Sequence, residues 1–96
     1  MAARNADVAV AANTWTALTD GDVSGNITIS SRYHYDIFLK AAVDGTTPTT
    51  FAGAVAYNAR MGEQGKTIAE LFPGLSSPDR IFAYCSEATV VNVSHG

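Results

Sequence analysis

Hydrophobic and polar residues alternate along most of this chain with a period of two, which is the period of a strand rather than of a helix. The clearest case is the segment HYDIFLKAAV, residues 34–43. Its mainly apolar odd-numbered side chains share one face of an extended strand, and Asp36, Phe38 and Lys40 share the other. This segment is therefore predicted to be a strand with one face in the core.

Similar runs predict further strands at residues 7–12, 14–19, 27–31, 54–61, 80–86 and 88–95. Segments rich in Gly, Asp, Asn, Pro and Thr separate them and are predicted to be turns or loops, at residues 20–26, 44–53 and 62–66. About seven short strands at this spacing are typical of a single-domain antiparallel β-sandwich of the jelly-roll or immunoglobulin-like type. The last two strands are expected to pair as a hairpin.

One helical turn interrupts the strands, in the segment TIAELFPG at residues 67–74. Thr67 is a good N-cap, and Glu70 stands three residues later, where its side chain can reach back to the cap. Pro73 and Gly74 then end the helix. The pattern predicts one or two turns at most.

The Gly65-Lys66-Thr67 sequence matches the end of a phosphate-binding loop, but the rest of that motif is missing. The opening glycine belongs at position 60, which is Arg60, and the nearest glycine, Gly62, stands two residues too late. The motif also needs a strand-to-helix crossover in a parallel sheet, which this chain is too short to build. We therefore expect a turn and a helix cap here, and no nucleotide site.

Composition supports one folded domain of 96 residues, with 47 % hydrophobic and 16 % charged residues. The net charge is −3 and the six basic residues are scattered, so nucleic acid is not expected as a direct partner. The start of the chain lacks the pattern of a secretory signal, and no apolar run approaches the ~20 residues of a membrane span. We expect no membrane contact and synthesis in a cytoplasm, with residues 1–6 as a candidate flexible arm.

Few residues suggest catalysis or metal binding. His34 and His95 have no ligand at metal-binding spacing, and the single cysteine, Cys85, shares a strand face with Ile81 and Ala83, which favours a buried thiol. The serines lack the context of an activated nucleophile, and no two carboxylates are spaced for acid–base work. The chain is therefore expected not to be an enzyme and to hold no cofactor or metal.

The aromatic residues allow two interpretations. Exposed rings could stack on sugars, and the candidates are Trp15, Tyr33, Tyr35, Tyr57 and Tyr84. The alternative, which we favour because a small core depends on aromatic area, is that core positions are filled by Trp15, Phe38, Phe82 and one or two tyrosines. Tyr33 and Tyr57 are flanked by polar residues and are expected at the surface.

Four segments together carry a family resemblance, namely NTWTALT, YDIFLKAAVDGTTPT, GAVAYNARMGE and RIFAYCSEATVVNVSHG. In this pattern the chain resembles the small all-β structural proteins of tailed-bacteriophage virions, of the head-decoration and head-fibre or spike-base type. The resemblance implies a non-enzymatic protein that binds the capsid surface as a decoration protein or anchors a head fibre or spike.

The same resemblance implies a location in the virion after synthesis in the bacterial host cytoplasm. The implied partners are the major capsid protein, a fibre protein, or both, together with self-association as a trimer or pentamer. Arg4, Tyr33 and Tyr57 are the candidate residues of the interaction surface. The alternative is a carbohydrate-binding β-sandwich module that uses exposed aromatic residues.

Overall fold

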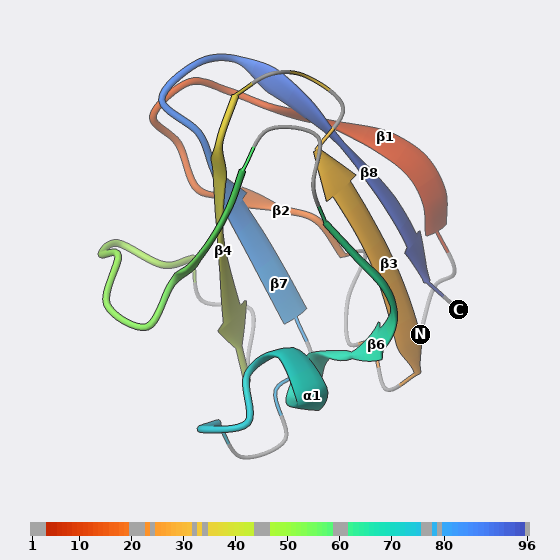
Figure 1. The fold of residues 1–96 in the computed structure, drawn as a ribbon. Coiled ribbons are helices and arrows are strands. Elements are labelled where there is room, and N and C mark those ends of the chain that lie inside the picture. The colour runs from red at the N-terminus through yellow and green to blue at the C-terminus, as the bar shows by residue number, and fades with distance from the viewer. Residues whose placement is uncertain are drawn as a thin grey trace.

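The computed structural model describes residues 4–19, 23, 25–31, 33, 35–43, 47–58, 62–75, 78 and 80–95. Within these residues the chain forms eight strands and one helical turn (Figure 1). In chain order they are β1 (Arg4–Val10), β2 (Thr16–Ala17), β3 (Asn26–Ser31), β4 (Ile37–Ala42), β5 (Val55–Tyr57), β6 (Gly62–Thr67), α1 (Ile68–Leu71), β7 (Arg80–Tyr84) and β8 (Thr89–His95).

The strands form two four-stranded antiparallel sheets that face each other as a sandwich (Figure 1). The first sheet has the order β1-β8-β3-β6 and the second has the order β2-β7-β4-β5. The predicted β-sandwich is thus confirmed. The pairs β1–β8, β2–β7, β3–β6 and β4–β5 are nested one inside the next, which is the connectivity of a jelly roll rather than of an immunoglobulin domain.

The predicted hairpin between the last two strands is wrong. β7 pairs with β2 and β4 in the second sheet, whereas β8 pairs with β1 and β3 in the first. The connection between them therefore crosses from one sheet to the other. Alternation in a sequence assigns side chains to faces but does not identify the neighbouring strand. Two strands that follow each other in the chain therefore need not pair.

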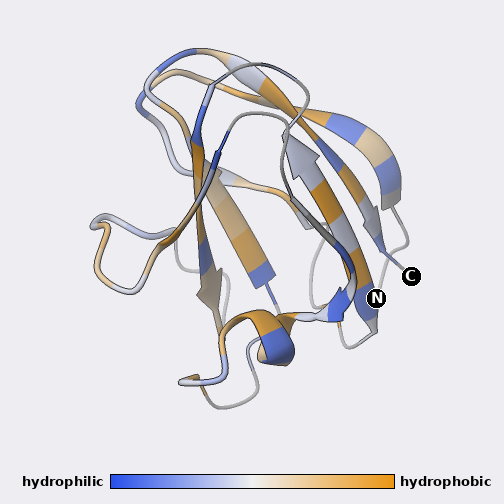
Figure 2. Ribbon diagram, in the orientation of Figure 1, coloured by the Kyte–Doolittle hydropathy of each residue, from blue (hydrophilic) through white to orange (hydrophobic). Residues whose placement is uncertain are grey.

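The core lies between the two sheets and is filled by aliphatic side chains from both. In β4, Ile37 and Leu39 are fully buried and Ala41 nearly so, while Phe38 and Lys40 point to the outer face, as the alternation predicts. Alternate positions of β3 and β8 are buried in the same way, and hydrophobic and polar bands alternate along β3 in Figure 2. This two-residue pattern is the reason that each strand has a core side and an outer side.

The segment predicted as a turn at residues 62–66 is instead the edge strand β6. Its register on β3 shifts between Ile27 and Ile29, because β6 carries an extra residue there as a bulge. Gly65 has φ +64° and donates its N–H to Thr28 Oγ1 at 3.1 Å. The predicted turn is therefore wrong, because the glycine-rich segment continues as a strand and Gly65 marks a bulge in it.

The helical turn α1 begins as predicted. The Glu70 N–H donates to Thr67 Oγ1 at 3.1 Å, and the Thr67 N–H donates to Glu70 Oε1 at 2.9 Å, which completes a capping box. The Gly65-Lys66-Thr67 sequence therefore ends an antiparallel edge strand and caps a single turn. This geometry differs from the parallel strand-to-helix turn of a phosphate loop.

The beginning of the chain is more ordered than the sequence suggests. β1 begins at Arg4, and Arg4, Asn5 and Ala6 are paired with His95, Ser94 and Val93 of β8. Residues 4–6 of the expected flexible arm therefore belong to a strand, and residues 1–3 lie outside the described residues.

Candidate binding surface

Aromatic side chains gather on the outer face of the second sheet. Phe38 of β4 lies opposite Tyr84 of β7, and both point away from the core because their neighbours Leu39 and Ala83 are the buried ones. Trp15, next to β2, contacts Tyr84 with the ring centroids 5.3 Å apart. Two strands of the second sheet and the residue just before β2 therefore supply rings to one surface.

Phe51 joins these rings from the loop between β4 and β5. Its ring centroid lies 4.7 Å from that of Tyr84, 5.4 Å from that of Phe38 and 5.5 Å from that of Trp15. We call these four residues, Trp15, Phe38, Phe51 and Tyr84, the outer aromatic cluster. Phe51 is its centre because it contacts each of the other three.

Local hydrogen bonds hold the loop against the sheet. Lys40 of β4 donates from Nζ to the carbonyl oxygen and to Oγ1 of Thr50, both at 3.2 Å. The Ala54 N–H donates to the Phe51 carbonyl at 3.0 Å, and Gly53 between them has φ +77°, as a type II turn requires. Hydrogen bonds to residues before and after Phe51 in the chain therefore hold its backbone in place.

The other end of the cluster is tied to the corner between β1 and β2. Tyr84 donates its hydroxyl to Asn13 Oδ1 at 3.1 Å. Asn13 has φ +56°, a conformation that asparagine tolerates better than most residues, and donates its N–H to the Cys85 carbonyl at 2.8 Å. The polar end of Tyr84 is therefore satisfied while its ring stays in the cluster.

The surface around this loop is unusually apolar. The large hydrophobic side chains exposed among the described residues are Tyr33 (49 %), Phe38 (36 %), Val43 (53 %), Phe51 (50 %) and Leu75 (42 %). All except Tyr33 lie in or beside the loop at residues 47–54: Phe38 contacts Phe51, and Val43 and Leu75 line a hollow with Thr47–Thr50. Part of this loop is coloured as hydrophobic in Figure 2.

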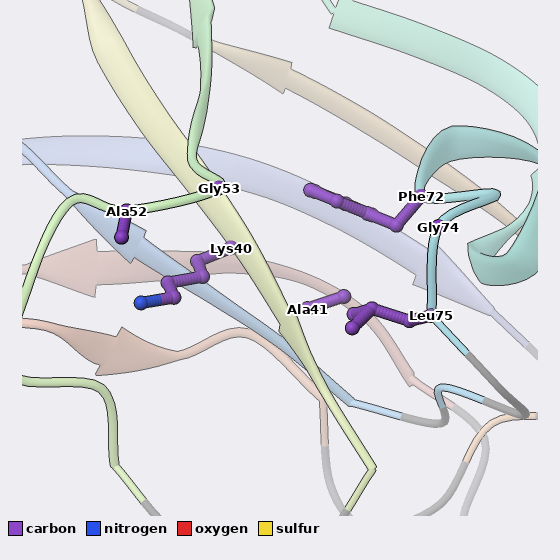
Figure 3. A pocket seen from close by; sticks show the side chains of 7 residues that line it. All are labelled: Lys40, Ala41, Ala52, Gly53, Phe72, Gly74 and Leu75. Carbon is purple, nitrogen blue, oxygen red and sulfur yellow. The ribbon is translucent and has the colours of Figure 1, made fainter.

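Two shallow hollows border the loop. The first, about 280 Å³, has Lys40 and Ala41 of β4 as its floor, with Ala52 and Gly53 on one side and Phe72, Gly74 and Leu75 on the other (Figure 3). The second, about 390 Å³, includes Val43 and Pro48. Lys40, Ala41 and Leu75 line both hollows, so the two hollows adjoin each other beside β4.

The rings of the cluster are tilted against each other. The interplanar angles are 48° and 51° for Trp15 with Phe51 and Tyr84, 66° for Phe38 with Phe51, and 85° for Phe51 with Tyr84. The contacts of Phe51 with Phe38 and Tyr84 are edge-to-face, an arrangement that is favourable between aromatic rings. They make an uneven, knob-like surface rather than a flat row of ring faces.

The structure places the three predicted interaction residues far from one another. Arg4 begins β1 opposite His95, at one end of β8, and its side chain lies outside the described part of the chain. Tyr33 lines a hollow with Thr89, at the other end of β8. Tyr57 is half-buried in β5 of the second sheet and packs against the core.

The core positions predicted for Trp15 and Phe38 are wrong, because both side chains lie on the outer face. Phe82 is buried as expected, but it lies opposite Lys40 on the outer face of β7 and is not among the residues packed between the sheets. The alternation that put Phe38 on the same face as Lys40 already contained this signal. Phe51 was missed because it stands in a loop rich in threonine, where no periodicity assigns it to a face.

The candidate chemical groups are dispersed. Cys85 is buried and its Sγ donates to the Asp36 carbonyl at 3.4 Å, His95 is buried at the end of β8, and His34 lies outside the described residues. Among the residues described, no three His, Cys, Asp or Glu side chains gather where they could hold a metal ion. None of the described helices has the length and apolar character needed to cross a membrane.

The cap of α1 shifts the pKa of the Glu70 carboxyl. The Thr67 N–H, the Thr67 hydroxyl and, to a lesser degree, Lys66 hold the pKa of Glu70 below its usual value, while partial desolvation opposes them. This shift belongs to the cap of α1 and not to the outer aromatic cluster.

Comparison of the chain with protein-family models, with curated proteins and with solved structures found no match.

Proposed function

We propose that this protein is a non-enzymatic structural protein of a tailed-bacteriophage virion that docks on the capsid through the outer aromatic cluster. The observation that carries the proposal is the concentration of exposed apolar side chains around one loop, with Phe51 and Phe38 at its centre. A contiguous apolar patch on a small domain is typical of a surface that another molecule covers.

The form of this surface suits a protein partner. Interface centres are enriched in aromatic residues that fill pockets on the partner, with polar residues around them. Phe51 projects from a fixed turn, and Lys40, Thr50 and Asn13 supply a polar surround. The jelly roll is a fold that viral capsid proteins use, although a fold alone does not specify a function.

The partner in this proposal is the major capsid protein, a fibre protein, or both, and the site of action is the virion. The double variant Phe38→Ser and Phe51→Ser tests it, by measuring the occupancy of capsids that have been stripped of the protein and incubated with it. We expect loss of binding by at least about tenfold, as for removal of a central aromatic anchor.

The matched control is Tyr33→Ser, because Tyr33 is as exposed as Phe51 (49 % and 50 %) but lies on the first sheet's side, in the hollow with Thr89. Capsid occupancy by this variant should equal that of the wild type. Circular dichroism confirms that each variant is folded. Undiminished occupancy by the double variant would contradict the proposal.

A second candidate function, carbohydrate binding, is favoured by one observation. Trp15 and Tyr84 lie side by side, half-buried, next to the side-chain amide of Asn13. Aromatic rings beside a hydrogen-bonding group are the usual components of a sugar site. The tilt of 51° between the two rings is unfavourable for a flat polysaccharide, so we rank this function second. A glycan array with the wild type and Trp15→Ala tests it, since specific binding would depend on Trp15.

A further inference from the structure

We infer that two copies of this chain associate through β1, pairing antiparallel about a two-fold axis so that their first sheets form one continuous sheet. The inference does not depend on the capsid proposal. It concerns the edge of the first sheet, whereas the proposed docking surface lies on the outer face of the second.

The four sheet edges differ in their ability to accept another strand. β2 contains two residues and β5 three, and β6 is interrupted by the bulge at Gly65. β1 contains seven residues and pairs with β8 without a register break. Short or bulged edges are the means by which proteins avoid edge-to-edge pairing, and β1 has neither protection.

The composition of β1 leaves its edge available. The strand RNADVAV contains no proline and no lysine, the residues that most often block an edge. Its central charge, Asp7, accepts a hydrogen bond at Oδ1 from Asn92 Nδ2 of β8 at 3.1 Å, so the carboxylate is engaged over its own sheet. In the described part of the chain, β8 is the only strand that pairs with β1.

The core side of β1 is also incompletely covered. Val10 is buried, Val8 is half-buried, and Ala6, on the same face, is exposed. Burial therefore decreases along the strand toward Arg4. A second strand beside β1 would cover this side as well as satisfy the backbone groups of the edge.

The register follows from the charges. Pairing β1 with itself about Asp7 would set two carboxylates opposite each other, which destabilises a strand pair. Pairing about Ala6 sets Asn5 of one copy opposite Asp7 of the other, so that an amide can donate to a carboxylate, and uses residues 4–8 of each copy. We therefore place the two-fold axis at Ala6. The other edges offer no unbroken strand of this length, because β2 and β5 are shorter and β6 carries the bulge at Gly65. A self-complementary edge closes as a dimer.

The first test is the mass of the purified full-length chain in solution by light scattering over a range of concentrations. We expect a dimer of about 20 kDa, twice the 10.1 kDa chain, and a monomer for Ala6→Lys, which sets two lysines opposite each other. The matched control is Ala69→Lys, at another exposed alanine, in α1, and this variant should remain dimeric. A wild-type monomer throughout, a trimer or pentamer, or an Ala6→Lys dimer would overturn the inference.

The second test examines the register by oxidative cross-linking. Ala6→Cys should form a covalent dimer, because residues directly opposite in an antiparallel pair have Cβ atoms close enough for a disulfide. Ala9→Cys, on the same strand, should not, and the native Cys85 is fully buried and does not interfere. Cross-linking at Ala9→Cys and not at Ala6→Cys would contradict pairing about Ala6.

Discussion

At the scale of single residues, Gly62 and Glu70 show how local geometry constrains this chain. Gly62 lies against the backbone of Ile29 and Ser30 in β3, and its lack of a side chain allows that approach. Glu70 closes the cap of α1. The sequence predicted the cap, because a capping box is a local pattern, but it could not predict the crowding at Gly62, which depends on a strand thirty residues earlier in the chain.

We predict that Gly62→Ala destabilises the protein by about 2 kcal/mol, as overpacking does in a region that cannot yield. An added Cβ would lie 2.6 Å from the Ser30 Cα and in conflict with the Ile29 carbonyl oxygen, and both are backbone atoms of β3. Urea denaturation measures the change. Gly74→Ala is the matched control, because nothing lies within 4 Å of its added Cβ. Equal stability of the two variants would show that β6 can move away from β3.

The lowered pKa of Glu70 predicts a pH dependence of stability. The native state favours the carboxylate, because it accepts the hydrogen bonds of Thr67, so the contribution is complete above the usual value of about 4.5 and is lost as the pH falls through the lower native value. We expect the wild type to melt at a higher temperature than Glu70→Gln near neutral pH. That difference should vanish in acid.

Thermal melts at several pH values measure this difference. Glu87→Gln, an exposed glutamate between β7 and β8, controls for the loss of one negative charge elsewhere on the surface. A difference between wild type and Glu70→Gln that stayed constant down to strong acid would show that the charge of Glu70 does not stabilise the cap.

At the scale of elements, the loop between β4 and β5 acts as a cover for the outer face of the second sheet. We predict that Phe51→Ala lowers stability by about 1 to 2 kcal/mol, less than the roughly 3 to 5 kcal/mol of a fully buried phenylalanine, because Phe51 is 50 % exposed. Trp15, the only tryptophan, should then emit at longer wavelength, since Phe51 packs against it. Fluorescence unchanged by Phe51→Ala would contradict this packing.

Elements with regular alternation were predicted well, and their partners were not. β4 has the predicted faces because Ile37, Leu39 and Ala41 repeat at the period of a strand. The neighbours of β7 and β8 depend on contacts across the whole chain, which no local pattern records. The binding surface was missed for a related reason: Phe51 meets Trp15 and Tyr84 only after three distant segments have come together.

At the scale of the whole molecule, the nested pairing of the jelly roll brings the most distant residues into contact. Arg4 pairs with His95, and each inner pair of strands encloses a shorter part of the chain. We predict slow refolding, in milliseconds to seconds, because these non-local pairs must form before the core is complete. Stopped-flow fluorescence of Trp15 measures the rate, and refolding within microseconds would show that local contacts dominate.

The pairing of Arg4 with His95 has one more consequence, which concerns the order of segments along the chain. Two positions so close in space can be joined by a short peptide, and the backbone can then be opened at an exposed bend such as Gly74 without changing any strand pair. A circular permutant of this kind should therefore keep the same strand pairs. It would differ only in the order in which the strands follow one another along the chain.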